Sequence, residues 1–390
     1  MPEQFLHGVE VVEIDTGTRP IRTVRSSVIG LVGTAPDADA AKFPINTPVL
    51  VAGKRSDAAG LGANGTLAPA IDDIFDQIGA VVVVIRVEEG ADDAATLSNI
   101  IGGTDDVTGQ PEGLQVLLAA ESVVKVAPRI IVVPEFSQEQ AVVSELVSIA
   151  TKLRAVIIAD GPNSTDADAI TYRENFGSDR IYLVDPWVKV WDTATSTEIV
   201  RPASARVAGV IAKSDAERGF WHSPSNRLID GITGTARAID FTLGDTTSRA
   251  NILNENEVTT IIQRDGYRLW GNRTLSADPK WAMLKRRRIS DMINESIMQA
   301  HFWAVDRNAD RTYFEDVVEG VNAYGSRMVN VGALVDFKCW ANPDLNTPEE
   351  LEAGNVYFDY DWVETPTAER ITFRSRINNG YLTQVLPNAA

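Results

Sequence analysis

The clearest potential for chemistry lies in a glycine-rich motif, Gly60-x-Gly62-x-x-Gly65. A helical pattern over Leu67–Ile78 follows it, and Glu88 lies roughly 20 residues beyond, where a dinucleotide-binding fold places its ribose-binding acid. In such a fold the first glycine follows its strand directly, so that the next helix aims its N-terminus at the pyrophosphate. Here Gly53–Ala59 separate the predicted strand end from the motif. The spacing favours a surface loop, and an α/β nucleotide-binding oxidoreductase stays open as the alternative function.

Other candidate motifs fail on spacing. Gly53-Lys54-Arg55 lacks the upstream glycine and the Mg²⁺-binding Ser or Thr of a phosphate loop. His7, His222 and His301 are too far apart for a zinc pattern. The acidic stretch Asp160–Asp168 lacks the register of a Ca²⁺ loop and is typical of a turn after a strand. We therefore predict no catalytic, cofactor-binding or metal-binding residues, and a protein that is not an enzyme.

The charge of the chain argues against two classes of partner. A net charge of −18 repels nucleic acid and anionic membranes, so neither is expected as a partner. The basic run Lys285–Arg288 lies in an amphipathic helical pattern, where a solvated face or an ion-pairing protein contact is favoured over phosphate binding. One cysteine, Cys339, excludes an intrachain disulfide, and the N-terminus has no signal-peptide pattern. We expect a protein kept in a reducing compartment.

The elements that would position any site form an α/β pattern. Apolar runs at Arg129–Pro134, Ala155–Asp160 and Arg180–Val184 alternate with helical patterns at Glu139–Leu153 and Asp166–Phe176. Runs that are apolar on both faces are typical of a mostly parallel sheet covered by helices. Further strands are predicted upstream at Ser27–Gly33, Pro48–Ala52 and Ala80–Val87.

The pattern changes in the C-terminal part. Two helices are predicted at Trp281–Ala304 and Thr312–Val329, and three strands follow at Ala333–Trp340, Asn355–Val363 and Arg370–Ile377. The predicted organisation is an N-terminal arm (1–21), an α/β domain (22–276), a small α+β domain (277–378) and a C-terminal arm (379–390).

The two ends are β-prone segments that are set off from the predicted cores. Phe5–Ile14 and Tyr381–Leu386 contain apolar side chains that are costly to expose, and an unpaired strand invites pairing with another chain. Fraying of both ends is the alternative. If the ends pair with neighbouring copies, we expect inter-subunit contacts through Phe5, Val9, Val11, Ile14, Tyr381, Leu382, Thr383, Val385 and Leu386.

Several unusual strings resemble the tail sheath proteins of contractile phages and R-type bacteriocins, particularly the P2-like and pyocin type. The longest are Glu217–Asn226 (ERGFWHSPSN) and Asp265–Leu275 (DGYRLWGNRTL). Others, in order along nearly the whole chain, are His7–Val9, Ser26–Gly33, Pro128–Pro134, Asp160–Thr165, Asp185–Asp192, Gly231–Ala236, Trp303–Arg307 and Asn342–Asn346.

The resemblance implies a structural subunit that polymerises as stacked hexameric rings around an inner tube and contracts to drive that tube through a target cell envelope. The implied partners are further copies of the chain, the inner tail tube protein, and the baseplate and tail terminator proteins. The implied location is a phage tail or bacteriocin particle, assembled in the bacterial host cytoplasm.

The small domain would face the tube, and both arms would complete sheets in neighbouring copies. The tube contact is expected either on the helix Thr312–Val329 or on the acidic turn Thr347–Gly354, and the sequence leaves both open. The candidate residues are Glu315, Glu319, Arg327, Glu349 and Glu350. A static capsid or adhesin-like protein, which would polymerise without contracting, is a further alternative.

Overall fold

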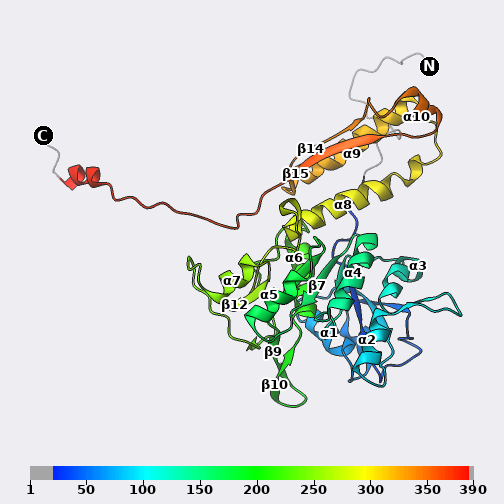
Figure 1. Cartoon of the computed structure of the whole chain (residues 1–390). Coiled ribbons are helices and arrows are strands. Elements are labelled where there is room, and N and C mark those ends of the chain that lie inside the picture. The colour runs from blue at the N-terminus through cyan, green and yellow to red at the C-terminus, as the bar shows by residue number, and fades with distance from the viewer. Residues whose placement is uncertain (1–20, 386–390) are drawn as a thin grey trace, which may run out of the picture.

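Residues 21–385 are described by a computed structural model, in which two lobes are joined by one long helix, α8 (Leu284–Ala300) (Figure 1). The larger lobe contains a six-stranded sheet with helices on both faces. The smaller lobe contains a second long helix beside a two-stranded sheet. Beyond the small lobe, the chain leaves as an extended segment that ends in a short helix.

The sheet of the larger lobe has the strand order β2-β3-β1-β6-β7-β8. Four neighbouring pairs are parallel, and β2 is antiparallel to β3. The strands are β1 (Ile29–Thr34), β2 (Pro48–Ala52), β3 (Val81–Val87), β6 (Ile130–Val132), β7 (Val156–Asp160) and β8 (Ile181–Val184). Their side chains are apolar on both faces because each face is covered: Leu31 packs in one core and Val32 in the other.

Helices cover both faces of this sheet. On one face lie α1 (Leu67–Phe75) and α6 (Ser204–Arg218). On the other lie α2 (Asp93–Ile101), α4 (Gln140–Leu153), α5 (Asp166–Glu174), α7 (Arg249–Glu255) and the 3₁₀ helix η2 (Gly113–Ala119), which continues into α3 (Ala120–Val124). Side chains cap the N-termini of α2 and α5. Asp92 accepts a hydrogen bond from the Ala95 amide at 2.7 Å, and Thr165 accepts one from the Asp168 amide at 3.1 Å.

Small β elements surround the main sheet. They are the hairpin β4 (Gly103–Thr104) and β5 (Pro111–Glu112), the sheet of β9 (Val188–Asp192), β10 (Thr197–Arg201) and β11 (Gly234–Thr235), and the hairpin β12 (Thr260–Gln263) and β13 (Tyr267–Trp270). β12 adjoins the main sheet, because Thr259 forms a bridge with Val184 at the end of β8.

The small lobe packs α9 (Arg311–Asn330) against the antiparallel pair β14 (Leu334–Ala341) and β15 (Phe358–Glu364). Its core is continuous with α8 through Ile289, Met292 and Ile293. Gly325 allows the close approach of helix and strand, because a Cβ there would lie 2.0 Å from the Phe337 ring. Short helices complete the lobe: η3 (Pro279–Trp281), η4 (Phe302–Ala304), α10 (Pro348–Glu352) and η5 (Asn379–Val385).

The predicted strands and helices between Ser27 and Val363 are confirmed, with ends shifted by a few residues, while the predicted N-terminal strand Phe5–Ile14 lies outside the described residues. The predicted strand Arg370–Ile377 is wrong for the isolated chain, because that segment has no regular structure and no neighbouring strand among residues 21–385. The β-prone segment Tyr381–Leu386 is likewise a 3₁₀ helix through Val385. The boundary at 276/277 stays a prediction, because α8 belongs to both lobes.

Candidate assembly surfaces

The sheet of the small lobe is incomplete. β14 and β15 pair only with each other among residues 21–385, so β15 presents an outer edge of backbone donors and acceptors. The outer edge of β14 is partly closed, because Asn322 of α9 accepts a hydrogen bond from the Cys339 amide at 2.8 Å and donates one to the Cys339 carbonyl at 2.9 Å. One face is closed by α9 through the aromatic side chains of Phe337, Phe358 and Tyr360. Two-stranded sheets are marginal alone, and open edges accept further strands. The geometry therefore suits the addition of strands from other chains.

The segment that follows β15 is bound to the rest of the chain at its start and then leaves both lobes. Lys285 Nζ donates a hydrogen bond to the Thr365 carbonyl, and Arg273 forms a bidentate ion pair with Glu369 at 2.7 and 2.9 Å. Beyond Glu369 the chain extends away from both lobes (Figure 1). It leaves its apolar side chains in water: Ile371 is 70% exposed, Phe373 91% and Ile377 94%.

These exposed residues alternate in the way a half-buried strand requires. Ile371, Phe373 and Ile377 share one parity, while Arg370, Arg374 and Arg376 share the other. An apolar row left in solvent is costly, and three arginines close together are unusual in a chain of net charge −18. Period-two alternation was visible in the sequence and predicted a strand. The sequence did not show that no strand within residues 21–385 pairs with it.

Some of the predicted inter-subunit residues lie within residues 21–385, and the others lie outside this range. Tyr381, Leu382 and Val385 are exposed on η5, to which Thr383 also belongs. Phe5, Val9, Val11, Ile14 and Leu386 lie outside the described residues.

The predicted tube-facing residues are not brought together. Glu315 and Glu319 lie on the first half of α9, one turn apart, and Glu315 pairs with Arg311 at 2.7 Å. Arg327 lies about 18 Å from Glu315 and about 12 Å from Glu319 along the helix axis, and its guanidinium donates to the Ile21 carbonyl.

The acidic turn lies at the far end of the small lobe from the α/β lobe (Figure 1). Glu349 is exposed in the first turn of α10, where hydrogen bonds from its own backbone and Thr347 lower its pKa. Glu350 Oε2 accepts hydrogen bonds from Asn355 at 2.7 Å and Tyr357 at 3.2 Å. Arg327 therefore belongs to a different surface from the four carboxylates.

The basic run Lys285–Arg288 joins the lobes. Lys285 and Arg286 bind the end of the small-lobe sheet, with Arg286 paired to Glu364 at 2.5 Å. Arg287 and Arg288 turn to the α/β lobe, where Arg288 pairs with Asp215 of α6. The expected ion-pairing contact is thus confirmed, and it lies within the chain.

Two carboxylates on the same helix extend this junction. Asp291, 1% exposed, accepts hydrogen bonds from Arg180 at 2.9 and 3.2 Å and from Arg287 at 2.9 Å. Glu295 pairs with Arg129 at 3.1 Å and Arg154 at 3.4 Å. We call Arg288, Asp291, Glu295 and their partners the junction cluster. Its helical residues are spaced three and four apart, so they share one face of α8.

Buried carboxylates in the α/β lobe have structural partners. Asp160, at the end of β7, accepts hydrogen bonds from the Ser204 amide at 2.8 Å and the Ser137 hydroxyl at 3.0 Å, and so ties α6 to the sheet. Complete burial raises its pKa to about 6. Burial likewise raises the pKa of Asp73 to about 6, although the charges of its partners Arg206 and Arg201 act to lower it.

The glycine-rich motif has a packing explanation. η1 (Arg55–Leu61) separates β2 from the second glycine, as the spacing predicted. Gly62 and Gly65 have φ values of 79° and 90°, and a Cβ at Gly65 would lie 2.4 Å from the Thr34 carbonyl oxygen. These glycines therefore allow the loop to turn against the end of β1. Within the described chain, no group of three or more His, Cys, Asp or Glu residues could hold a metal ion, and no helix is long and apolar enough to span a membrane.

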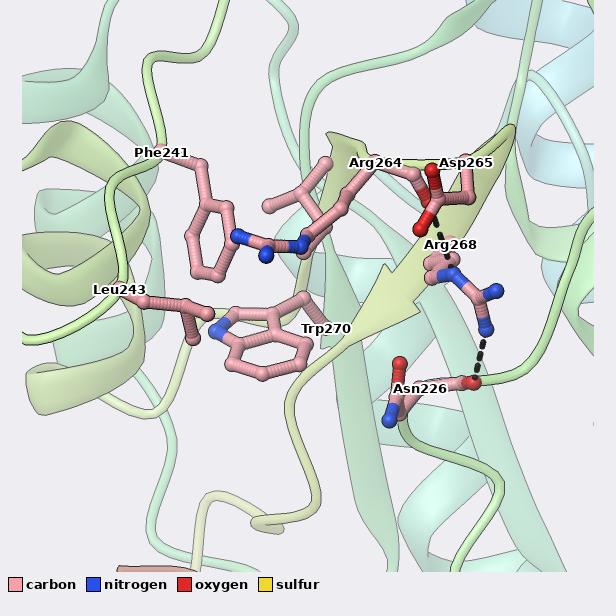
Figure 2. A pocket seen from close by; sticks show the side chains of 8 residues that line it. Asn226, Phe241, Leu243, Arg264, Asp265, Arg268 and Trp270 are labelled. Carbon is pink, nitrogen blue, oxygen red and sulfur yellow. Dashed lines mark hydrogen bonds between the residues drawn. The ribbon is translucent and has the colours of Figure 1, made fainter.

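A pocket that the sequence did not reveal opens beside β12 and β13. It has a volume of about 290 Å³, with walls formed by Phe241, Leu243 and Trp270 and a rim that carries Arg264 and Arg268 (Figure 2). Phe241 and Trp270 pack edge to face at 5.0 Å. Its residues come from three parts of the chain, at Asn226, at Phe241 and Leu243, and between Ile262 and Trp270, so no local motif marks it.

Comparison with known proteins identifies the family. Family models match in succession along the chain: the tail sheath protein Gp18 domain III N-terminal region over residues 26–87, the phage tail sheath protein central domain over 109–275, and the phage tail sheath C-terminal domain over 276–378. A putative prophage major tail sheath protein of Pseudomonas aeruginosa (strain UCBPP-PA14) is 45% identical over 98% of this chain and 99% of its own length. The chain belongs to the phage tail sheath family. The tail sheath protein of Escherichia phage P2 is 41% identical over 98% of each chain.

Solved structures of contractile particles share the fold of this sheath protein. The helical sheath of the anti-feeding prophage in its contracted state has a TM-score of 0.72 at 18% identity, covering 95% of this chain and 99% of that one. The sheath complex of an extracellular contractile injection system, PVC, in the contracted state has a TM-score of 0.70 at 16% identity, covering 97% and 99%. The resemblance found in the sequence is confirmed, and the chain has a structural role in a contractile tail or a related particle.

Proposed function

We propose that this sheath protein polymerises as stacked hexameric rings around an inner tube and contracts to drive the tube through a target cell envelope. The observation that carries the proposal is the pairing of an incomplete sheet with an unsatisfied strand in the same chain. β15 offers an open edge and β14 a partly open one, and residues 370–377 carry an apolar row that nothing else within residues 21–385 covers. Since this segment extends away from its own lobe, donation to another copy satisfies both.

The distribution of charge supports the pairing of residues 370–377 with the sheet of a second copy. Asp336 and Asp361 are exposed on β14 and β15. Arg370, Arg374 and Arg376 would lie opposite such carboxylates if residues 370–377 added to the sheet of a second copy. A donor on one side of the chain and an acceptor on another make a head-to-tail contact, which propagates into rings or helices. The N-terminal arm, residues 1–21, would supply a further strand.

The junction cluster supports rigid-body movement during contraction. Buried ion pairs on α8 connect the two lobes, so each subunit would rotate and slide as one unit. The donated segments would act as tethers that keep neighbouring subunits connected. The free energy would come from improved packing between subunits, with no nucleotide or other cofactor and no catalytic step.

The remaining partners follow from the family. The small lobe would face the inner tail tube protein through the carboxylates of Glu315, Glu319, Glu349 and Glu350, while baseplate and tail terminator proteins would bound the polymer. Arg327 is less suited to the tube, since it binds the Ile21 carbonyl at the other end of α9. Assembly would take place in the bacterial host cytoplasm.

The strand-donation step is tested by two neighbouring substitutions. Phe373→Asp places a charge on the row that would be buried in the recipient, whereas Thr372→Asp places the same charge on the opposite face. We expect Phe373→Asp to give folded monomers without polymers, and Thr372→Asp to polymerise. Electron microscopy and circular dichroism provide the readouts. Normal polymers from Phe373→Asp would contradict strand donation.

Deletion of the segment gives an independent check. A chain that ends at Glu369 keeps the ion pair with Arg273, and we expect it to stay folded without assembling. Deletion of only Tyr381–Ala390 distinguishes the contribution of η5 and the last residues. Sheaths of normal length from both deletions would refute the proposed arm.

A further inference from the structure

A knob and a socket of complementary chemistry lie on opposite sides of the α/β lobe. The knob is the turn between β4 and β5, residues 105–110. The socket is the pocket lined by Phe241, Leu243, Arg264 and Trp270 (Figure 2). Neither belongs to the small lobe or to the terminal arms.

The knob is a firmly built turn with an apolar tip. Asp105 Oδ1 accepts hydrogen bonds from the Val107 amide at 3.0 Å, the Thr108 amide at 2.5 Å and the Thr108 hydroxyl at 2.7 Å. These bonds hold Val107 outward, where it is 92% exposed. The carboxylate of Asp106 beside it has no partner within residues 21–385. A preorganised turn loses little conformational entropy when it binds.

The socket offers matching groups. Its walls are the rings of Phe241 and Trp270 and the Leu243 side chain, which is 60% exposed. Arg268 is engaged with the carbonyls of Arg264 and Asn226 at 2.9 and 3.1 Å. The Arg264 guanidinium lies at the mouth beside the two rings, and no acceptor in the described chain pairs with it. Asp265 is the only carboxylate in the lining, so the pocket keeps a net positive charge.

Topology places the two features at opposite edges of the main sheet. The knob follows α2 and packs on η2, on the side of β3 and β2. The socket belongs to β12 and β13, which adjoin β8 at the other edge. Six strands separate these edges by about 24 Å. Figure 1 shows the same separation between the side that carries α2 and α3 and the side that carries α7 and β12. One chain cannot close this contact on itself.

We propose that the knob of one subunit docks in the socket of a second copy, with Val107 packed against Leu243 and the aromatic walls and Asp106 paired with Arg264. This contact is head-to-tail and gives the larger lobe its own polymerisation surface, in addition to the strand exchange of the small lobe. The proposal rests on the proposed polymerisation, since a monomeric protein would have no second copy to bind.

A charge exchange tests the pairing. Arg264→Glu and Asp106→Arg are each expected to raise the concentration needed for polymerisation about fivefold or more, and the double variant Arg264→Glu/Asp106→Arg to return it to that of the wild type. The matched control Arg264→Glu/Glu121→Arg has the same net charge with the arginine on α3. We expect it to stay impaired. Equal rescue by both double variants, or unimpaired single variants, would overturn the proposal.

Cross-linking tests the geometry independently. The native Cys339 is buried, and burial raises its pKa to about 11, so it gives little background. In the variant Val107→Cys/Leu243→Cys, mild oxidation of polymers should give a ladder of covalent multimers, and oxidation of monomers should give none. Polymers that yield no ladder would overturn the knob-and-socket contact. Absence of polymers from the wild type would instead contradict the proposed function.

Discussion

Removal of one carboxylate from the junction cluster should destabilise the protein strongly. Asp291→Ala eliminates three charge-assisted hydrogen bonds, two from Arg180 and one from Arg287. The Arg180 guanidinium, itself buried, would keep only its bond to the Ala155 carbonyl at 3.0 Å. Breaking a buried ion pair by removing one partner costs about 3–5 kcal/mol, because the remaining charge stays desolvated. We expect a loss of that size in the free energy of unfolding.

The measurement is urea unfolding of the full chain, followed by tryptophan fluorescence at a concentration where chromatography shows monomer. Glu315→Ala is the matched control, since it also removes a carboxylate paired with an arginine on a helix. Its pair with Arg311 is solvated, with side chains 91% and 55% exposed, so we expect no measurable change. A loss below about 1 kcal/mol for Asp291→Ala, or equal losses for both variants, would refute the claim that buried ion pairs hold the lobes together.

Two further substitutions test packing and pH dependence. Gly325→Ala forces a methyl group into the Phe337 ring and should lower the free energy of unfolding, measured in urea, by about 1–3 kcal/mol. The control Gly320→Ala lies in the same helix, where the new methyl group meets nothing within 4 Å, and should be neutral or slightly stabilising. Equal effects of the two variants would contradict the close packing of α9 on β14. Because the pKa of Asp160 is raised from 3.8 to about 6, its protonation stabilises the fold at low pH, and this contribution is lost as pH rises through 6. The stability of the wild type relative to Asp160→Asn should therefore fall between pH 4 and pH 7 by on the order of 3 kcal/mol, and a pH-independent difference would show that burial does not raise this pKa.

Burial explains which elements were predictable from the sequence. Strands such as Val156–Asp160 are apolar on both faces because helices cover them, so local composition carries the information. The alternation in Arg370–Ile377 is as clear, yet the segment has no partner strand in the described part of the chain, residues 21–385. Local pattern predicts the tendency of a segment to form a strand, but the pairing depends on which chain supplies the neighbouring edge.

Candidate sites were predictable to a lesser degree for a similar reason. The basic run Lys285–Arg288 was evident, and an ion-pairing contact was one expected role. Its partners Asp179, Asp215 and Glu364 are distant in sequence, so their identity required the fold. The pocket at Phe241 and Trp270 likewise depends on three segments that meet only in three dimensions. Function came from family-specific strings, since the α/β fold by itself is shared by many activities.

Polymerisation is tested most directly by negative-stain electron microscopy of the purified full chain, first alone and then with tube protein added. We expect hollow, ridged cylinders of uniform width, formed by subunits that donate residues 370–377 to their neighbours. Discrete globular particles that remain unchanged at high concentration and after addition of tube protein would contradict polymerisation. They would favour the alternative, a nucleotide-binding oxidoreductase that uses the loop at Gly60–Gly65.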